Sequence, residues 1–176
     1  MNKPFAAMTL AVAALVAAAV PLAMAGGEGQ GKASPLDAMK KLAGSWTPAK
    51  KAPDGGPGVT ATYRVTAGGS VVMETLFPGT DDEMITMYYM DGDDLMLTHF
   101  CKMGNQPRMK AEASKEPGVI SFAFRDGTNI KSRDDAHMDS LKMTMADDDH
   151  LRAEWGMWKD GKSTGHAAFE LVRAAK

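Results

Sequence analysis

The sequence is poor in cysteine and has no excess of positive charge. Cys101 is the single cysteine among 176 residues. One thiol excludes an internal disulfide, so packing alone must hold the folded chain together. The formal net charge is −2, and a mildly acidic chain lacks the basic face that nucleic-acid binding requires. We therefore expect no nucleic-acid partner.

Long apolar runs are also missing, apart from one near the N-terminus at residues 6–19. Lys3 precedes this run and Ala23-Met24-Ala25 follows it, which is typical of a cleaved signal peptide. A membrane anchor is the alternative, but spanning a bilayer takes about 20 apolar residues. A lipoprotein anchor would need a cysteine at the cleavage point, and there is none, so we do not expect such an anchor. We expect cleavage after Ala25, a periplasmic or secreted protein, and no stable membrane span.

What the sequence does contain is a succession of short strand patterns from Gly44 to Arg173. Residues 59–65, for example, alternate apolar with polar side chains, as a half-buried strand does. Turn signals separate the patterns at Gly68-Gly69, Pro78-Gly79, Asp91-Gly92, Asp126-Gly127 and Asp160-Gly161. Evenly spaced strands joined by short turns usually form a meander that closes into a barrel, because closure removes exposed strand edges. The pattern predicts an all-β, antiparallel up-and-down barrel of about ten strands.

A short helix is expected before the first strand. Residues 26–33 form a glycine-rich leader, and the domain itself is predicted to span residues 34–176. Ser34 can cap the helix, Pro35 suits its first position, and Asp37 favours its positive end. The helix should run to about Leu42 and cover one end of the barrel.

Three strands, at residues 70–77, 83–90 and 94–101, carry large apolar groups on both faces. A period of two does not then reveal which face is inside. Either face of these strands can point inward, and a helix or a second subunit can cover the other. The oligomeric state is likewise left undefined by the sequence.

The two ends of the strand region resemble the lipocalin-like, or calycin, pattern. Gly44 and Trp46 stand at the first strand, and Arg173 ends the last. This resemblance implies that the tryptophan lies at a closed barrel end beneath the basic side chain. Residues 75–79, 97–101 and 104–108 are also similar to a group of small exported bacterial proteins of unknown function. The resemblance implies a fold and no activity.

His99 and Cys101 stand two residues apart and therefore share one face of a strand. Such a pair can ligate a metal or haem iron, or act as base and nucleophile. The alternative is a hydrogen-bonded histidine beside a thiol that only packs, and we assign Cys101 to packing. No metal-type spacing surrounds the pair. We assign no metal ligand and no catalytic residue, and an enzyme is the less favoured class.

Glu74 lies between Val72 and Leu76 on an otherwise apolar face. If that face is inward, the carboxylate needs a buried partner, such as Arg64 or Arg108; if it is outward, Glu74 is an ordinary solvated residue. His99 would likewise need a hydrogen-bond partner.

Glu74 and Tyr89 are the candidate partners of His99. The predicted ligand-binding residues are therefore Glu74, Tyr89, His99 and Arg108.

The leading hypothesis is a barrel that binds a small apolar or amphipathic molecule inside. It predicts an interior cavity of roughly a few hundred Å³, lined by Met, Phe and Tyr. The alternatives are a haem or metal binder that uses His99, and an envelope-associated structural protein whose barrel is filled by its own side chains. The sequence identifies neither a ligand nor a cofactor.

Overall fold

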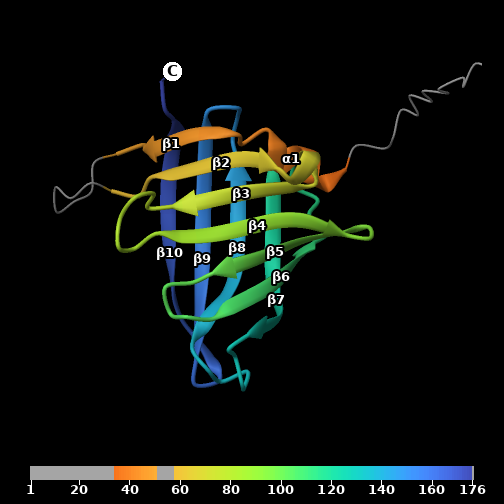
Figure 1. Cartoon of the computed structure of the whole chain (residues 1–176), viewed down its shortest axis with the longest axis vertical. Helices are drawn as coiled ribbons and strands as arrows, with labels where there is room; N and C mark the ends of the chain where they lie inside the picture. The colour runs from red at the N-terminus through yellow and green to blue at the C-terminus, as the bar shows by residue number, and fades with distance from the viewer. Residues whose placement is uncertain (1–33, 51–57, 176) are drawn as a thin grey trace, which may run out of the picture. The chain divides into compact units, whose positions relative to one another are not determined.

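A computed structural model describes residues 34–50 and 58–175, and in this part of the chain ten antiparallel strands form a closed barrel. Each strand pairs with its neighbours along the chain, and the first strand pairs with the last (Figure 1). This confirms the predicted up-and-down barrel. The strands are β1 (Gly44–Pro48), β2 (Ala61–Thr66), β3 (Val71–Leu76), β4 (Met84–Asp91), β5 (Asp94–Phe100), β6 (Gln106–Glu112), β7 (Val119–Thr128), β8 (His137–Met145), β9 (His150–Lys159) and β10 (Lys162–Arg173).

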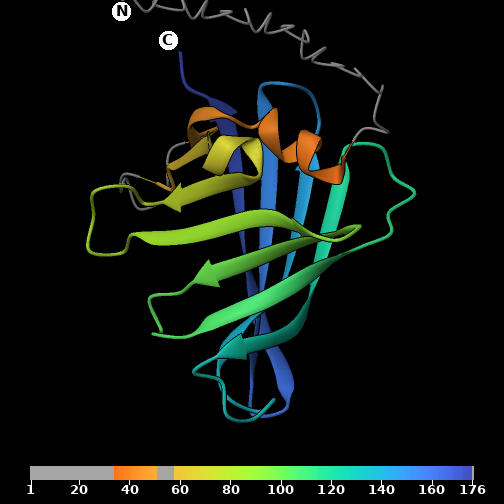
Figure 2. The same cartoon turned by 45° about the vertical axis from the view of Figure 1, so that its right-hand side comes forward.

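The helix α1 (Pro35–Lys40) lies at one end of the barrel and contacts β3 and β4 (Figure 2). Ser34 caps it: its hydroxyl accepts a bond from the Leu36 amide, and its own amide donates to Asp37 Oδ2 at 2.9 Å. The helix ends at Lys40, two residues before the expected Leu42. Leu42 is nevertheless buried, so the apolar face continues into the turn.

The strand registers settle which faces of β3, β4 and β5 point inward. Glu74 pairs with Thr86, and Thr86 pairs with His99. All three are buried, and so are the neighbouring inward residues Val72, Leu76, Tyr88 and Leu97. The poor alternation has a local cause, because Thr75 and Met96 on the opposite face are also buried. The Met96 sulfur lies 3.8 Å from Arg125 Nη1, so this arginine covers it from outside.

Trp46 is buried at the α1 end, and its indole N–H donates to the Leu42 carbonyl at 2.8 Å. The Arg173 guanidinium lies 4.5 Å from the centre of the Trp46 ring, so the expected cation–π contact is present. The same guanidinium donates to the carbonyls of Lys41 and Ala43, at 3.0 and 2.9 Å. Arg173 thus ties the last strand to the segment between α1 and β1.

A second arginine is held between aromatic rings at the opposite end of the barrel. The Arg133 guanidinium lies 4.8 Å from the centre of the Phe124 ring and 4.1 Å from that of Trp158. It also donates to His137 Nε2 at 2.7 Å and pairs with Asp139. Both ends therefore carry a guanidinium over an indole ring, but only the Trp46 end was indicated by the sequence.

Candidate functional site

The interior contains one row of polar side chains that crosses four strands. Tyr63 on β2 pairs with Glu74 on β3, and the row continues through Thr86 on β4 to His99 on β5. All four side chains are buried. Residues that face each other across antiparallel strands are close enough to interact, so the register itself assembles the row.

Two tyrosines donate hydrogen bonds to the Glu74 carboxylate: Tyr63 lies within this row, and Tyr88 lies beside it. Tyr63 donates its hydroxyl to Oε1 at 2.6 Å, and Tyr88 donates to Oε2 at 2.8 Å. Burial raises the pKa of Glu74, although the tyrosine hydrogen bonds act against that shift. Burial and the nearby Glu74 carboxylate also raise the pKa of both tyrosines, which keeps the donors protonated.

His99 is 1% exposed. Its Nδ1 lies 2.9 Å from the Thr86 hydroxyl, and its ring packs against Trp155 with the ring centres 4.6 Å apart and the ring planes tilted by 40°. Burial lowers the pKa of His99 to about 4, so the imidazole is neutral at pH 7. The Trp155 indole N–H, on the same ring pair, has no hydrogen-bond partner among the described residues.

Two of the four predicted ligand-binding residues do not belong to this interior row. The Tyr89 hydroxyl lies 3.1 Å from the Thr98 hydroxyl, and Arg108 pairs with Asp126 at 2.8 Å on the surface. Neighbouring residues on a strand point to opposite faces, so inward Tyr88 and Met109 send Tyr89 and Arg108 outward. Placing them with Glu74 and His99 was wrong.

The proposed arginine partners of Glu74 were wrong for the same reason. Arg64 is exposed and contacts Thr66 and Met73, and Arg108 is engaged by Asp126. Two tyrosine hydroxyls satisfy the carboxylate in their place. A neutral donor pair satisfies the carboxylate without the cost of desolvating a second charge.

Cys101 lies just beyond the end of β5, half-buried, in the turn before β6. Its amide donates to the Asn105 carbonyl at 3.1 Å. Burial raises the pKa of the thiol, which disfavours the reactive thiolate. The expectation that Cys101 lies in a strand was therefore wrong by one residue.

A haem or metal site at His99 does not fit the packing. With 1% of its surface exposed, His99 has no open side that a porphyrin could reach without displacing the core. Within residues 34–50 and 58–175, no group of three or more His, Cys, Asp or Glu side chains is arranged to hold a metal ion. The polar row thus has the character of a hydrogen-bonded core.

A cavity of about 590 Å³ opens at the α1 end of the barrel, and we call it the mouth cavity. Its apolar wall comes from α1 and from the ends of β5, β6 and β7. Four charged side chains lie along it: Asp93, Asp94, Lys110 and Glu112. The apolar wall residues are Pro35, Ala38, Leu95, Ala111, Ala113, Val119 and Ile120.

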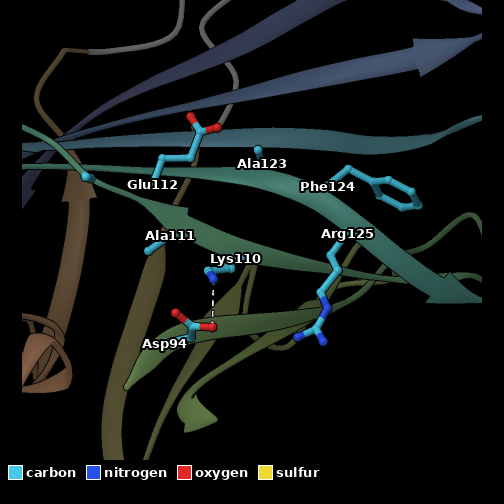
Figure 3. Close-up of a pocket in the computed structure, with 8 residues that line it drawn as sticks. Asp94, Lys110, Ala111, Glu112, Ala123, Phe124 and Arg125 are labelled. Atoms are coloured by element: carbon cyan, nitrogen blue, oxygen red, sulfur yellow. Dashed lines mark ion pairs between the residues drawn. The ribbon is translucent and has the colours of Figure 1, made fainter. Parts of the chain in front are cut away.

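A groove of about 570 Å³ adjoins the mouth cavity and shares Asp94, Lys110, Ala111 and Glu112 with it (Figure 3). Lys110 Nζ lies 2.7 Å from Asp94 Oδ2, so this ion pair stands where the two hollows meet. The groove continues along β7 past Ala123 and Phe124. The two hollows therefore adjoin at β6, where they share these lining residues.

The mouth cavity was missed at the level of sequence. Its only local signal is the pair Ala111 and Ala113, small side chains at positions where other strands carry large ones. The remaining wall comes from segments far apart in the chain, namely α1 and the starts of β5 and β7. The predicted lining of Met, Phe and Tyr was wrong for this cavity.

No family model matches the sequence, and no curated protein matches it significantly. Among solved structures, the crystal structure of Rv2717c from M. tuberculosis is similar, with 19% sequence identity and a TM-score of 0.49. The match covers 82% of this chain and 100% of that chain. The barrel agrees with the lipocalin-like architecture expected from the sequence, and membership of the calycin family stays a prediction.

Proposed function

We propose that this protein binds a small amphipathic molecule in the mouth cavity. The observation that carries the proposal is a hollow of about 590 Å³ with an apolar wall and a few charged groups along it. Ligand sites are typically clefts of about 300–1,000 Å³ with mostly apolar walls and few polar groups. An apolar chain would lie against Ala38, Leu95 and Ile120, and a polar head would lie beside the charged side chains.

The ligand is placed at the mouth because large side chains fill the interior behind it. On β7, the inward residue after Ile120 is Phe122, which is buried and lies 5.8 Å from the Tyr88 ring, between ring centres. Tyr88 in turn donates to Glu74. The path from the mouth to the polar row is therefore occupied, and we move the predicted site from the interior to the mouth.

The test measures whether Nile red, an uncharged fluorescent probe, binds saturably to the protein. The protein is purified from the cells that naturally produce it. We expect one site per chain. Ala38→Trp places an indole in the cavity from α1, so we expect it to weaken binding by about tenfold or more, equivalent to about 1.4 kcal/mol.

Ala168→Trp is the matched control, because Ala168 is exposed on β10 and does not line the cavity. It should bind the probe as the parent does. Absence of saturable binding in the parent, or equal binding by both variants, would contradict the proposal.

A second candidate function is structural, and the filled interior favours it. Trp46, Tyr88, Phe122 and Trp155 are all buried, as expected of a barrel packed by its own side chains. An envelope-associated protein of this kind needs no ligand. It would be the better account if the parent bound no probe.

We also propose that the protein is exported. The supporting pattern is the predicted signal peptide, residues 1–25, which lies outside the described residues. Within residues 34–50 and 58–175, no helix is both long and apolar enough to cross a bilayer. An intact mass that starts at Gly26 is expected, and a protein that keeps Met1 would contradict cleavage.

A further inference from the structure

We propose that the mouth cavity selects cationic amphiphiles, molecules with an apolar chain and an ammonium-type head. This inference rests on the proposed function, because the cavity supplies the site and its charges choose the ligand. Three of the four charged residues along the cavity are carboxylates and one is an ammonium group. The excess of negative charge is thus local to the cavity lining, while the chain as a whole is close to neutral.

Pairing within the cavity leaves the excess negative charge on two residues. The one cation, Lys110, lies 2.7 Å from Asp94 and is neutralised by it. Asp93 and Glu112 also line the cavity, and in the described part of the chain neither has a cationic partner within 4.0 Å. Two carboxylates therefore remain to attract a positive head group and to repel a negative one.

The position of these carboxylates suits an amphiphile. Asp93 lies in the turn between β4 and β5, and Glu112 ends β6, so they stand on two of the elements that form the opening. The apolar groups Ala38, Leu95 and Ile120 lie on α1, β5 and β7. A chain in contact with the apolar wall would leave its head near the opening, where the two carboxylates are exposed.

The size of the preference follows from this exposure. At a given separation, two unit charges interact several times more strongly near a protein surface than in bulk water. Because attraction of a cation and repulsion of an anion add, we expect at least about a tenfold difference in affinity. Salt should reduce the difference, since the Debye length falls to about 3 Å at 1 M.

The experiment measures displacement of Nile red by dodecyltrimethylammonium and by dodecyl sulfate, each below its micelle concentration, with dodecyl maltoside as the uncharged reference. We expect the affinity to be highest for dodecyltrimethylammonium, intermediate for dodecyl maltoside and lowest for dodecyl sulfate, with about tenfold or more between the first and the last. The double variant Asp93→Asn/Glu112→Gln should bring the two charged probes to within about twofold of each other.

The matched control is Asp81→Asn/Glu83→Gln, which removes the same charge from exposed positions that do not line the cavity. It should keep the preference of the parent. If the parent binds Nile red but the two charged probes compete equally, the charge selection is refuted and ligand binding stands. Equal loss of preference in both double variants would also refute it, since net charge alone would then explain the result. If Nile red does not bind, the proposed function itself fails.

Discussion

The protein should lose part of its free energy of unfolding at acidic pH because of His99, and replacing His99 by glutamine should remove that loss. Burial lowers the pKa of His99 from 6.5 to about 4. A group whose pKa is depressed in the folded state contributes stability that is present above its unfolded pKa. That stability is lost as the pH falls towards the folded value. The relevant window therefore runs from about pH 6.5 down to about pH 4.

The magnitude follows from the size of the shift. One pKa unit corresponds to about 1.4 kcal/mol, so the full window is worth about 3 kcal/mol and most of it, about 2.5, is lost by pH 4.5. Glu74 acts in the opposite sense, because its pKa is raised and its stabilising effect is lost as the pH rises. Glu74 is present in both the parent and the variant, so comparing the two isolates the histidine.

The assay is urea unfolding followed by tryptophan fluorescence at pH 7 and pH 4.5. At pH 7 the His99→Gln variant should be less stable by about 1 kcal/mol, because glutamine loses the ring contact with Trp155. At pH 4.5 the order should reverse, because only the parent has a histidine that takes up a proton on unfolding while it stays largely neutral in the folded state. His166→Gln, at an exposed histidine on β10, should follow the parent. A stability difference between parent and His99→Gln that is the same at both pH values would refute the reasoning.

Two further predictions concern the barrel end and the buried carboxylate. Trp46→Ala should lower the free energy of unfolding by about 3–5 kcal/mol, because it empties a packed position beneath Arg173; an unchanged Tm would contradict this. Tyr63→Phe should cost about 1.5–3 kcal/mol at pH 7, because Glu74 loses a donor in the interior. The cost should shrink when Glu74 is glutamine, so strictly additive effects in a double-mutant cycle would count against the bond.

The fold was predictable because its signals are local. Turn residues such as Gly92 and Gly161 have positive φ in the structure, the conformation that glycine adopts at no steric cost. The inward faces of β3, β4 and β5 were not predictable, because residues on the outer faces are buried as well. Only the pairing of strands decided that Glu74 and His99 point inward.

The candidate site was predictable only in part. A glutamate and a histidine on apolar faces indicated polar groups in the core, and both are there. Their partners were not readable, because the contact between Tyr63 and Glu74 depends on the register of two strands. The mouth cavity was even less predictable from the sequence, because it forms only when α1 and three strands assemble.

The closing pair of strands has a consequence for how the chain folds. β1 is short and pairs with β10 only from Trp46 opposite Arg173 to Pro48 opposite Leu171. Because β1 and β10 are the first and the last strand of the described chain, the barrel stays an open sheet until all ten strands are available. Folds dominated by such distant pairings fold slowly, and an open sheet exposes two unpaired edges meanwhile. Loss of Leu171 to Arg173, the residues of β10 that pair with β1, would therefore leave the sheet open and prone to pair with other chains.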